Sequence, residues 1–73
     1  MFKTKIELVT LKDVQKFVNI VSKIKGDIFL KDGENFCVSA KSIMGAIAAL
    51  EWNTLYCYSN IDISYEIRDF IVD

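Results

Sequence analysis

Apolar and polar residues alternate along the start of the chain and then change to a helical period. Between Phe2 and Leu8 the alternation has a period of two, which is typical of a half-buried strand. Thr10 then favours a helix N-cap, with Asp13 three residues later in a variant of the capping box. Gly26 supplies the expected C-terminal stop. The apolar positions of this predicted helix are Val14, Phe17, Val18, Val21 and Ile24.

The middle of the chain predicts two strands and a short helix. The stretch from Asp27 to Lys31 alternates again, and Asp32-Gly33 predicts a hairpin turn into a strand from Asn35 to Ser39. Ser42 is the expected N-cap of a short apolar helix that ends near Leu50.

The last third predicts one more strand, from Thr54 to Ser59, and a last helix capped by Asn60 or Asp62. The apolar stripe of that helix comprises Ile63, Ile67, Phe70 and Ile71. The predicted order is therefore β-α-β-β-α-β-α, in a single domain that spans residues 1–73. This order favours an α+β fold, in which three helices cover one face of a four-stranded antiparallel sheet.

Composition narrows the class of protein. Hydrophobic residues make up 52% of the chain, which argues against disorder. Nine basic and ten acidic residues leave a net charge of −1, which predicts no direct nucleic-acid partner and no polybasic membrane signal. The sequence has no apolar run near the ~20 residues of a membrane helix and no signal-peptide pattern. Two cysteines without any histidine make zinc an unexpected ligand and fit a cytoplasmic protein with reduced thiols.

One segment resembles a known bacterial family. Residues Lys41-Ser42-Ile43-Met44-Gly45, within VSAKSIMGAIAAL, are similar to the serine-site helix of HPr, the small phosphocarrier of the sugar phosphotransferase system. Ser22-Lys23 and Asp27-Ile28-Phe29-Leu30 support the resemblance. It implies the HPr fold, an open-faced β-sandwich with three helices on one side of an antiparallel sheet and the strand order 1-4-2-3.

The resemblance also locates the family's carrier site, and there this chain departs from it. The family's phosphorylated histidine corresponds to Thr10, its nearby arginine to Lys12 and its helix-opening proline to Asp13. A phosphothreonine ester is too stable for a relay, and an acyl phosphate on Asp13 normally needs a bound metal and a base. We therefore expect Thr10 to be an N-cap, and the chain to be neither an enzyme nor a phosphocarrier, with no cofactor.

The family's regulatory chemistry points to Ser42. In the family an HPr kinase phosphorylates this serine, and the modified protein binds a repressor-like regulator; the histidine-lacking Crh paralogues serve regulation only. Residues that the resemblance places in the partner-binding surface are Lys12, Lys41, Ile43, Met44 and Ile47. The alternative is that Ser42 is an unmodified helix cap, which alone explains a serine there.

The open side of the predicted sheet is a second candidate surface. Phe29, Tyr56 and Tyr58 are expected to project from it, either as an interaction patch or as pairs that stabilise neighbouring strands. Cys37 and Cys57, separated by the second strand, are expected to be half-buried free thiols. The sequence thus favours an HPr-like regulatory protein; the alternative is an interaction module or homodimer that uses the fold without phosphorylation.

Overall fold

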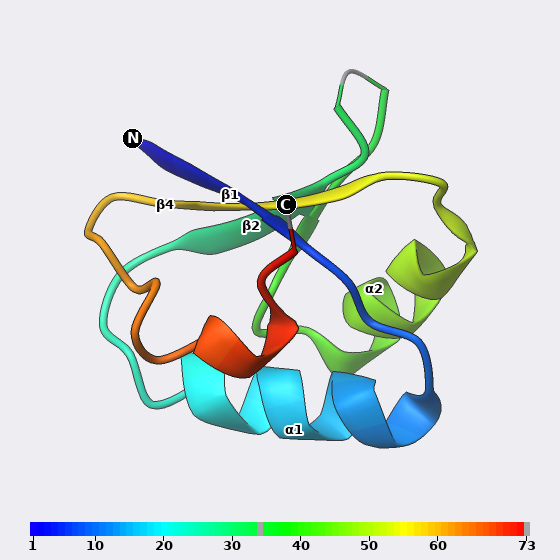
Figure 1. Cartoon of the computed structure of the whole chain (residues 1–73), viewed down its shortest axis with the longest axis horizontal. Coiled ribbons are helices and arrows are strands. Elements are labelled where there is room, and N and C mark those ends of the chain that lie inside the picture. Colours follow the sequence, from blue (N-terminus) through cyan, green and yellow to red (C-terminus); the bar gives the residue numbers. More distant parts are fainter. Residues whose placement is uncertain (34, 73) are drawn as a thin grey trace.

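Four strands and two α-helices form two layers in the computed structural model, which describes residues 1–33 and 35–72 (Figure 1). The elements in chain order are β1 (Phe2–Ile6), α1 (Leu11–Val21), β2 (Ile28–Lys31), β3 (Cys37–Ser39), α2 (Ile43–Ala48), the 3₁₀ helix η1 (Ala49–Glu51), β4 (Leu55–Ser59) and the 3₁₀ helix η2 (Arg68–Phe70). All pairs in the sheet are antiparallel, in the order β1-β4-β2-β3. The helices lie on one side of the sheet and leave its other side open (Figure 1). The predicted α+β class and strand order are confirmed.

Alternation along the strands separates the two sides of the sheet. In β4, Leu55 and Cys57 are buried on the side of the helices, whereas Tyr56 and Tyr58 between them are half-buried on the open side. In β2, Ile28 and Leu30 are buried in the same way. Because successive side chains of a strand point to opposite faces, the cross-strand register carries this division through the whole sheet.

Helix α1 begins at the predicted cap and buries four of the five residues in the predicted stripe; the fifth, Ile24, lies after the helix and is half-buried. The Thr10 hydroxyl accepts the Asp13 N–H at 3.1 Å, while the Asp13 carboxylate accepts the Thr10 N–H at 3.2 Å, so the capping box is complete. The helix ends at Val21, before the predicted stop; Gly26, with φ +97°, belongs to the loop that follows. The buried side chains of α1 are Val14, Phe17, Val18 and Val21.

The predicted last helix is wrong, although three of the four residues in its predicted apolar stripe are buried; the fourth, Ile71, is exposed. Ile63, Ile67 and Phe70 are buried, yet the segment forms turns and the short η2 instead of an α-helix. The reason is that the chain must return to the sheet. The Glu7 N–H donates to the Phe70 carbonyl at 2.8 Å, and the Val72 N–H donates to the Lys5 carbonyl at 3.0 Å. Ile71 and Val72 pair with β1 in extended backbone, so no helix can continue through the predicted Ile71, and the described residues contain two α-helices where three were predicted.

Two other predicted boundaries differ in the structure. The predicted apolar helix stops at Ala48 and tightens into η1. The predicted turn Asp32-Gly33 is part of a longer loop, in which the Asp32 carboxylate accepts the N–H groups of Asn35 and Phe36; Glu34 lies outside the described residues. Within the described ranges, no helix has the length and apolar character that crossing a membrane requires.

Candidate functional site

The start of helix α2 places Ser42 at the surface as an N-cap, as predicted. Its backbone is extended, and its hydroxyl accepts the Gly45 N–H at 3.2 Å. The Ser42 side chain is exposed, so the hydroxyl remains reachable from solvent. The helix that it caps has only six residues, and its dipole is correspondingly weak as a source of anion binding.

Lys41, next to Ser42 in the chain, has its hydrogen-bond partner outside helix α2. Its ammonium donates to the Ile24 carbonyl, in the loop after α1, and the residue is half-buried. This bond ties the start of α2 to the end of α1. A negative charge on Ser42 would therefore meet a lysine that already has a partner, while Lys12 stands exposed on the first turn of α1.

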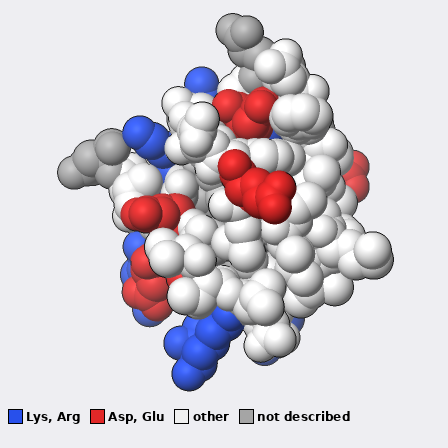
Figure 2. All heavy atoms as spheres, turned by 90° about the vertical axis from the view of Figure 1, so that its right-hand side faces the viewer, with Lys and Arg blue, Asp and Glu red and all other residues white. Residues whose placement is uncertain are grey.

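Apolar side chains are exposed on α2 and at the start of α1. Ile43 is 44% exposed, Met44 80% and Ile47 42%, and Leu11 at the first position of α1 is 58% exposed. We call Leu11, Ile43, Met44 and Ile47 the α2 face. The two helices are in contact, and Figure 1 shows α2 above the N-terminal end of α1. Figure 2 shows that the centre of this side of the molecule is mostly uncharged, with separate acidic side chains on it and basic side chains at its left and lower edges.

The sequence prediction named three members of the α2 face and missed Leu11. Leu11 stands three residues before Val14 and so continues the buried stripe of α1 in sequence. It is exposed nevertheless. The available signal was its place at the first position of the helix, directly after the N-cap.

Thr10 and Asp13, at the start of α1, are engaged in hydrogen bonds to the backbone. The Thr10 hydroxyl is held in the capping box, and the Asp13 carboxylate also accepts the Val9 N–H at 3.0 Å. These backbone N–H groups, that of Val9 first and that of Thr10 second, lower the pKa of Asp13 below its ordinary value. Both side chains thus stabilise the start of α1.

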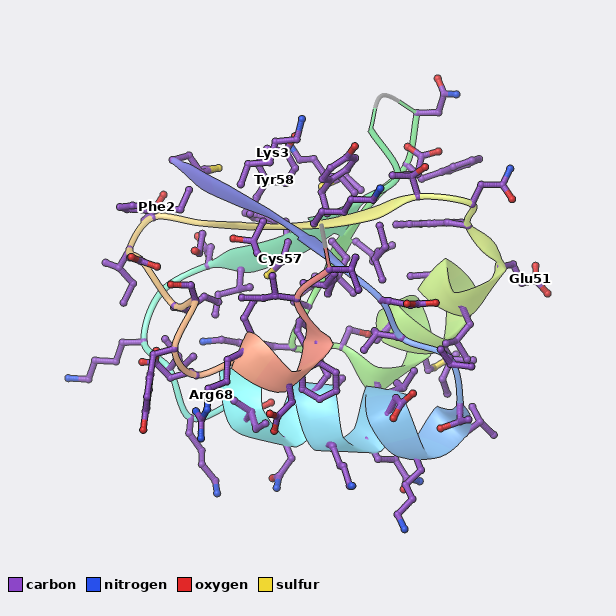
Figure 3. The ribbon with its side chains drawn as sticks, viewed as in Figure 1. Phe2, Lys3, Glu51, Cys57, Tyr58 and Arg68 are labelled. Atoms are coloured by element: carbon purple, nitrogen blue, oxygen red, sulfur yellow. The ribbon has the colours of Figure 1, made fainter. Side chains whose placement is uncertain are left out.

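The open side of the sheet carries the three predicted aromatic residues and lysines that the prediction overlooked. Phe29 is directly opposite Tyr58 in the register, and Lys31 is opposite Tyr56. The Lys3 ammonium lies 4.3 Å from the centre of the Tyr56 ring, and the Lys31 ammonium lies 4.5 Å from that of Tyr58. In Figure 3, Lys3 and Tyr58 lie on one side of the sheet and Cys57 on the other. The lysines were detectable from the period-two pattern of β1, which places Lys3 and Lys5 on one face.

The two cysteines are free thiols of different kinds, on strands separated by β2 as predicted. The expectation that both are half-buried is wrong: Cys37 is exposed on the edge strand and Cys57 is buried under the helices. Burial raises the pKa of Cys57 to about 12. Among the described residues, no three Cys, Asp or Glu side chains are grouped as a metal site would require.

Comparisons with protein-family models, with curated proteins and with solved structures give no match to this chain.

Proposed function

We propose that the chain is an HPr-like regulatory protein without carrier activity, which binds a protein partner through the α2 face and is controlled by phosphorylation of Ser42. The observation that carries this proposal is the exposed apolar set of the α2 face beside an exposed serine. The strand order β1-β4-β2-β3 agrees with the order that the resemblance to HPr implies.

The apolar character of the α2 face supports a protein partner. Each of its four side chains leaves at least 42% of its surface in water, at positions where a soluble protein gains nothing from an apolar residue. Burial against a partner returns roughly 25 cal/mol for each Å² of apolar surface. Methionine, the most exposed member, adapts its shape to different partners and is common in interaction surfaces.

The non-carrier part of the proposal is supported by the absence of histidine and by the environment of Thr10 and Asp13. A phosphoryl relay needs an acceptor whose phosphorylated form is reactive. The Thr10 hydroxyl and the Asp13 carboxylate are both engaged in the capping box, and no imidazole exists in the sequence.

Phosphorylation of Ser42 would change the α2 face by charge. A phosphate adds about −1.5 to −2 charge at neutral pH. The phosphate has three strong acceptor oxygens, so even with Lys41 nearby some of them would remain available to a partner's arginine or lysine. The same surface would then favour a basic partner when modified and an apolar partner when unmodified.

The test is intact-mass spectrometry after two incubations, one with ATP and an HPr kinase, the other with phosphoenolpyruvate and the first enzyme of the phosphotransferase system. We expect one phosphate from the kinase, mapped to Ser42 and lost in Ser42→Ala, and none from phosphoenolpyruvate. Ser22→Ala, at an exposed serine that ends α1, is the matched control and should still be modified.

A second pair of variants separates the serine from the surface around it. Met44→Glu places a charge on the α2 face and should slow modification by the kinase. Tyr65→Glu, at a site that is 72% exposed outside this face, should leave the rate unchanged. No phosphate at Ser42 under any condition would contradict the regulatory proposal, and would favour an interaction module or homodimer without phosphorylation.

A further inference from the structure

The open side of the sheet presents eight side chains in two rows that run across all four strands. The register aligns Lys3, Tyr58, Phe29 and Ser39 in one row, and Lys5, Tyr56, Lys31 and Cys37 in the other. We call these eight residues the sheet face. None of the helices covers it, because they pack on the opposite side (Figure 1).

The charge of the sheet face is entirely positive. It contains three lysines and no acidic residue. Since the whole chain has a net charge of −1, these three lysines leave −4 on the rest of the chain. The near-neutral total, which predicted no nucleic-acid partner, therefore hides an uneven distribution. A surface of this kind is complementary to an anion.

The aromatic residues of the sheet face give it a second property. Tyr56 and Tyr58 are two residues apart on β4, and Phe29 is the cross-strand neighbour of Tyr58. All three rings are half-buried. Their exposed parts provide an aromatic platform on this surface. The carboxylates of an acidic peptide do not stack on such rings, whereas a nucleotide chain has flat bases that do.

We propose that the sheet face binds single-stranded nucleic acid. Lys3, Lys5 and Lys31 neutralise phosphodiester groups, and bases stack on Tyr56, Tyr58 and Phe29. Single strands fit better than a duplex, because stacking on protein rings requires bases that are free of their neighbours. This site lies on the side of the sheet away from the helices and does not depend on the α2 face.

The cation–π contacts on the sheet face belong to its unbound state. Lys3 lies over Tyr56 and Lys31 over Tyr58, so each of these two tyrosine rings holds one ammonium. A base that stacks on a ring displaces the ammonium from it. The long lysine side chain then allows its ammonium to reach the phosphate of the same nucleotide.

Fluorescence anisotropy with labelled single-stranded RNA and DNA of roughly 12 nucleotides tests the proposal. Between about 50 and about 200 mM salt, binding through three lysines predicts a slope of about −2 in a plot of log K against log salt. Each of Lys3→Gln and Lys31→Gln should reduce the size of that slope by about 0.7. Tyr58→Leu should weaken binding by about tenfold or more, and Tyr58→Phe should preserve it.

The control is a second cation–π pair outside the sheet face. The Arg68 guanidinium lies 4.3 Å from the centre of the Tyr65 ring, so Tyr65→Leu removes a comparable ring and should leave binding unchanged. Circular dichroism confirms that each variant is folded. The RNA and DNA arms show which sugar is preferred. The proposal is overturned if neither strand binds at low salt, if Tyr58→Leu binds as the parent does, or if a polyglutamate peptide of equal charge binds as tightly.

Discussion

The carboxylate of Asp13 illustrates how one side chain determines where an element begins. It accepts the N–H groups of Val9 and Thr10, two donors that have no partner within α1. The same contacts lower the pKa of Asp13, because they favour its charged form. Stability contributed in this way is present above the ordinary pKa of an aspartate and is lost as the pH falls through the lowered value.

We expect Asp13→Asn to reduce the urea midpoint at neutral pH, because an amide oxygen is a weaker acceptor than a carboxylate. The difference from the parent should begin to shrink below about pH 4, where this carboxylate takes up a proton in the unfolded chain, and should disappear as the pH falls through the lowered pKa of folded Asp13. Urea titrations across this range provide the measurement. Asp69→Asn, which removes an exposed charge outside the capping box, separates the effect of net charge from that of the cap. A difference that does not change with pH would contradict the assignment.

At the scale of single residues, the sequence predicted what depends on near neighbours. The caps Thr10 and Ser42 were predictable because an N-cap hydroxyl and the backbone N–H that donates to it lie three residues apart. The environments of Cys37 and Cys57 were not, since they depend on which strand forms the sheet's edge and on where helices pack. Lys41 is a similar case: its partner, Ile24, is 17 residues away in the chain.

At Gly45 in helix α2, packing against strand β3 outweighs the low intrinsic helix propensity of glycine. A Cβ atom on Gly45 would lie 3.1 Å from the Val38 Cβ and 3.5 Å from the Ser39 carbonyl oxygen. The Val38 Cβ is attached directly to the backbone of β3 and cannot move aside without moving the strand. Glycine at this position therefore permits close approach of α2 to the sheet.

We expect Gly45→Ala to lower the free energy of unfolding by about 1 kcal/mol, because the cost of overpacking exceeds the gain in helix propensity. Ala48→Gly, at an exposed position of the same helix, should also lower it by about 1 kcal/mol, through propensity alone. Thermal or urea unfolding of both variants is the measurement. A stabilised Gly45→Ala protein would show that β3 yields to α2 at little cost.

Elements with a strong hydrophobic period were predicted better than the residues at which elements begin and end. The strands and α1 follow patterns that any core-facing element must have. The segment after β4 kept its helical spacing of buried residues but became turns and η2, since the backbone of Phe70 and Val72 pairs with β1. A contact of this kind joins opposite ends of the chain, and no local pattern records it.

At the scale of the whole molecule, the C-terminal segment completes the core. The ring of Phe70 meets that of Phe17 edge to face, with centres 5.4 Å apart. Ile63 and Ile67 are buried beside the same core. The strand order was predicted by resemblance to a family and not by periodicity, which reveals strands but not their neighbours. The uneven charge between the sheet face and the rest of the chain likewise emerges only when the order is known.

We expect Phe70→Ala to lower the free energy of unfolding by about 3–5 kcal/mol, the usual cost of removing a buried aromatic ring. A domain of this length has a total stability of roughly 4–11 kcal/mol, so the variant should lose a large share of it. Urea titration followed by circular dichroism measures the loss. Tyr65→Ala, at a 72% exposed ring in the same segment, should change stability by less than about 0.5 kcal/mol. Equal effects of the two changes would mean that the segment does not belong to the core.

The pairing of the C-terminal segment with β1 also bears on how the protein avoids aggregation. An unpaired outer strand is a template for the backbone of another chain. Here the Ile6–Ile71 bridge and the Val72–Lys5 hydrogen bond occupy part of the outer side of β1. The opposite edge, β3, offers a ladder of only three residues, Cys37–Ser39. The residues that replace the end of the predicted helix thus block part of the longer edge of the sheet, where the backbone of another copy could otherwise pair.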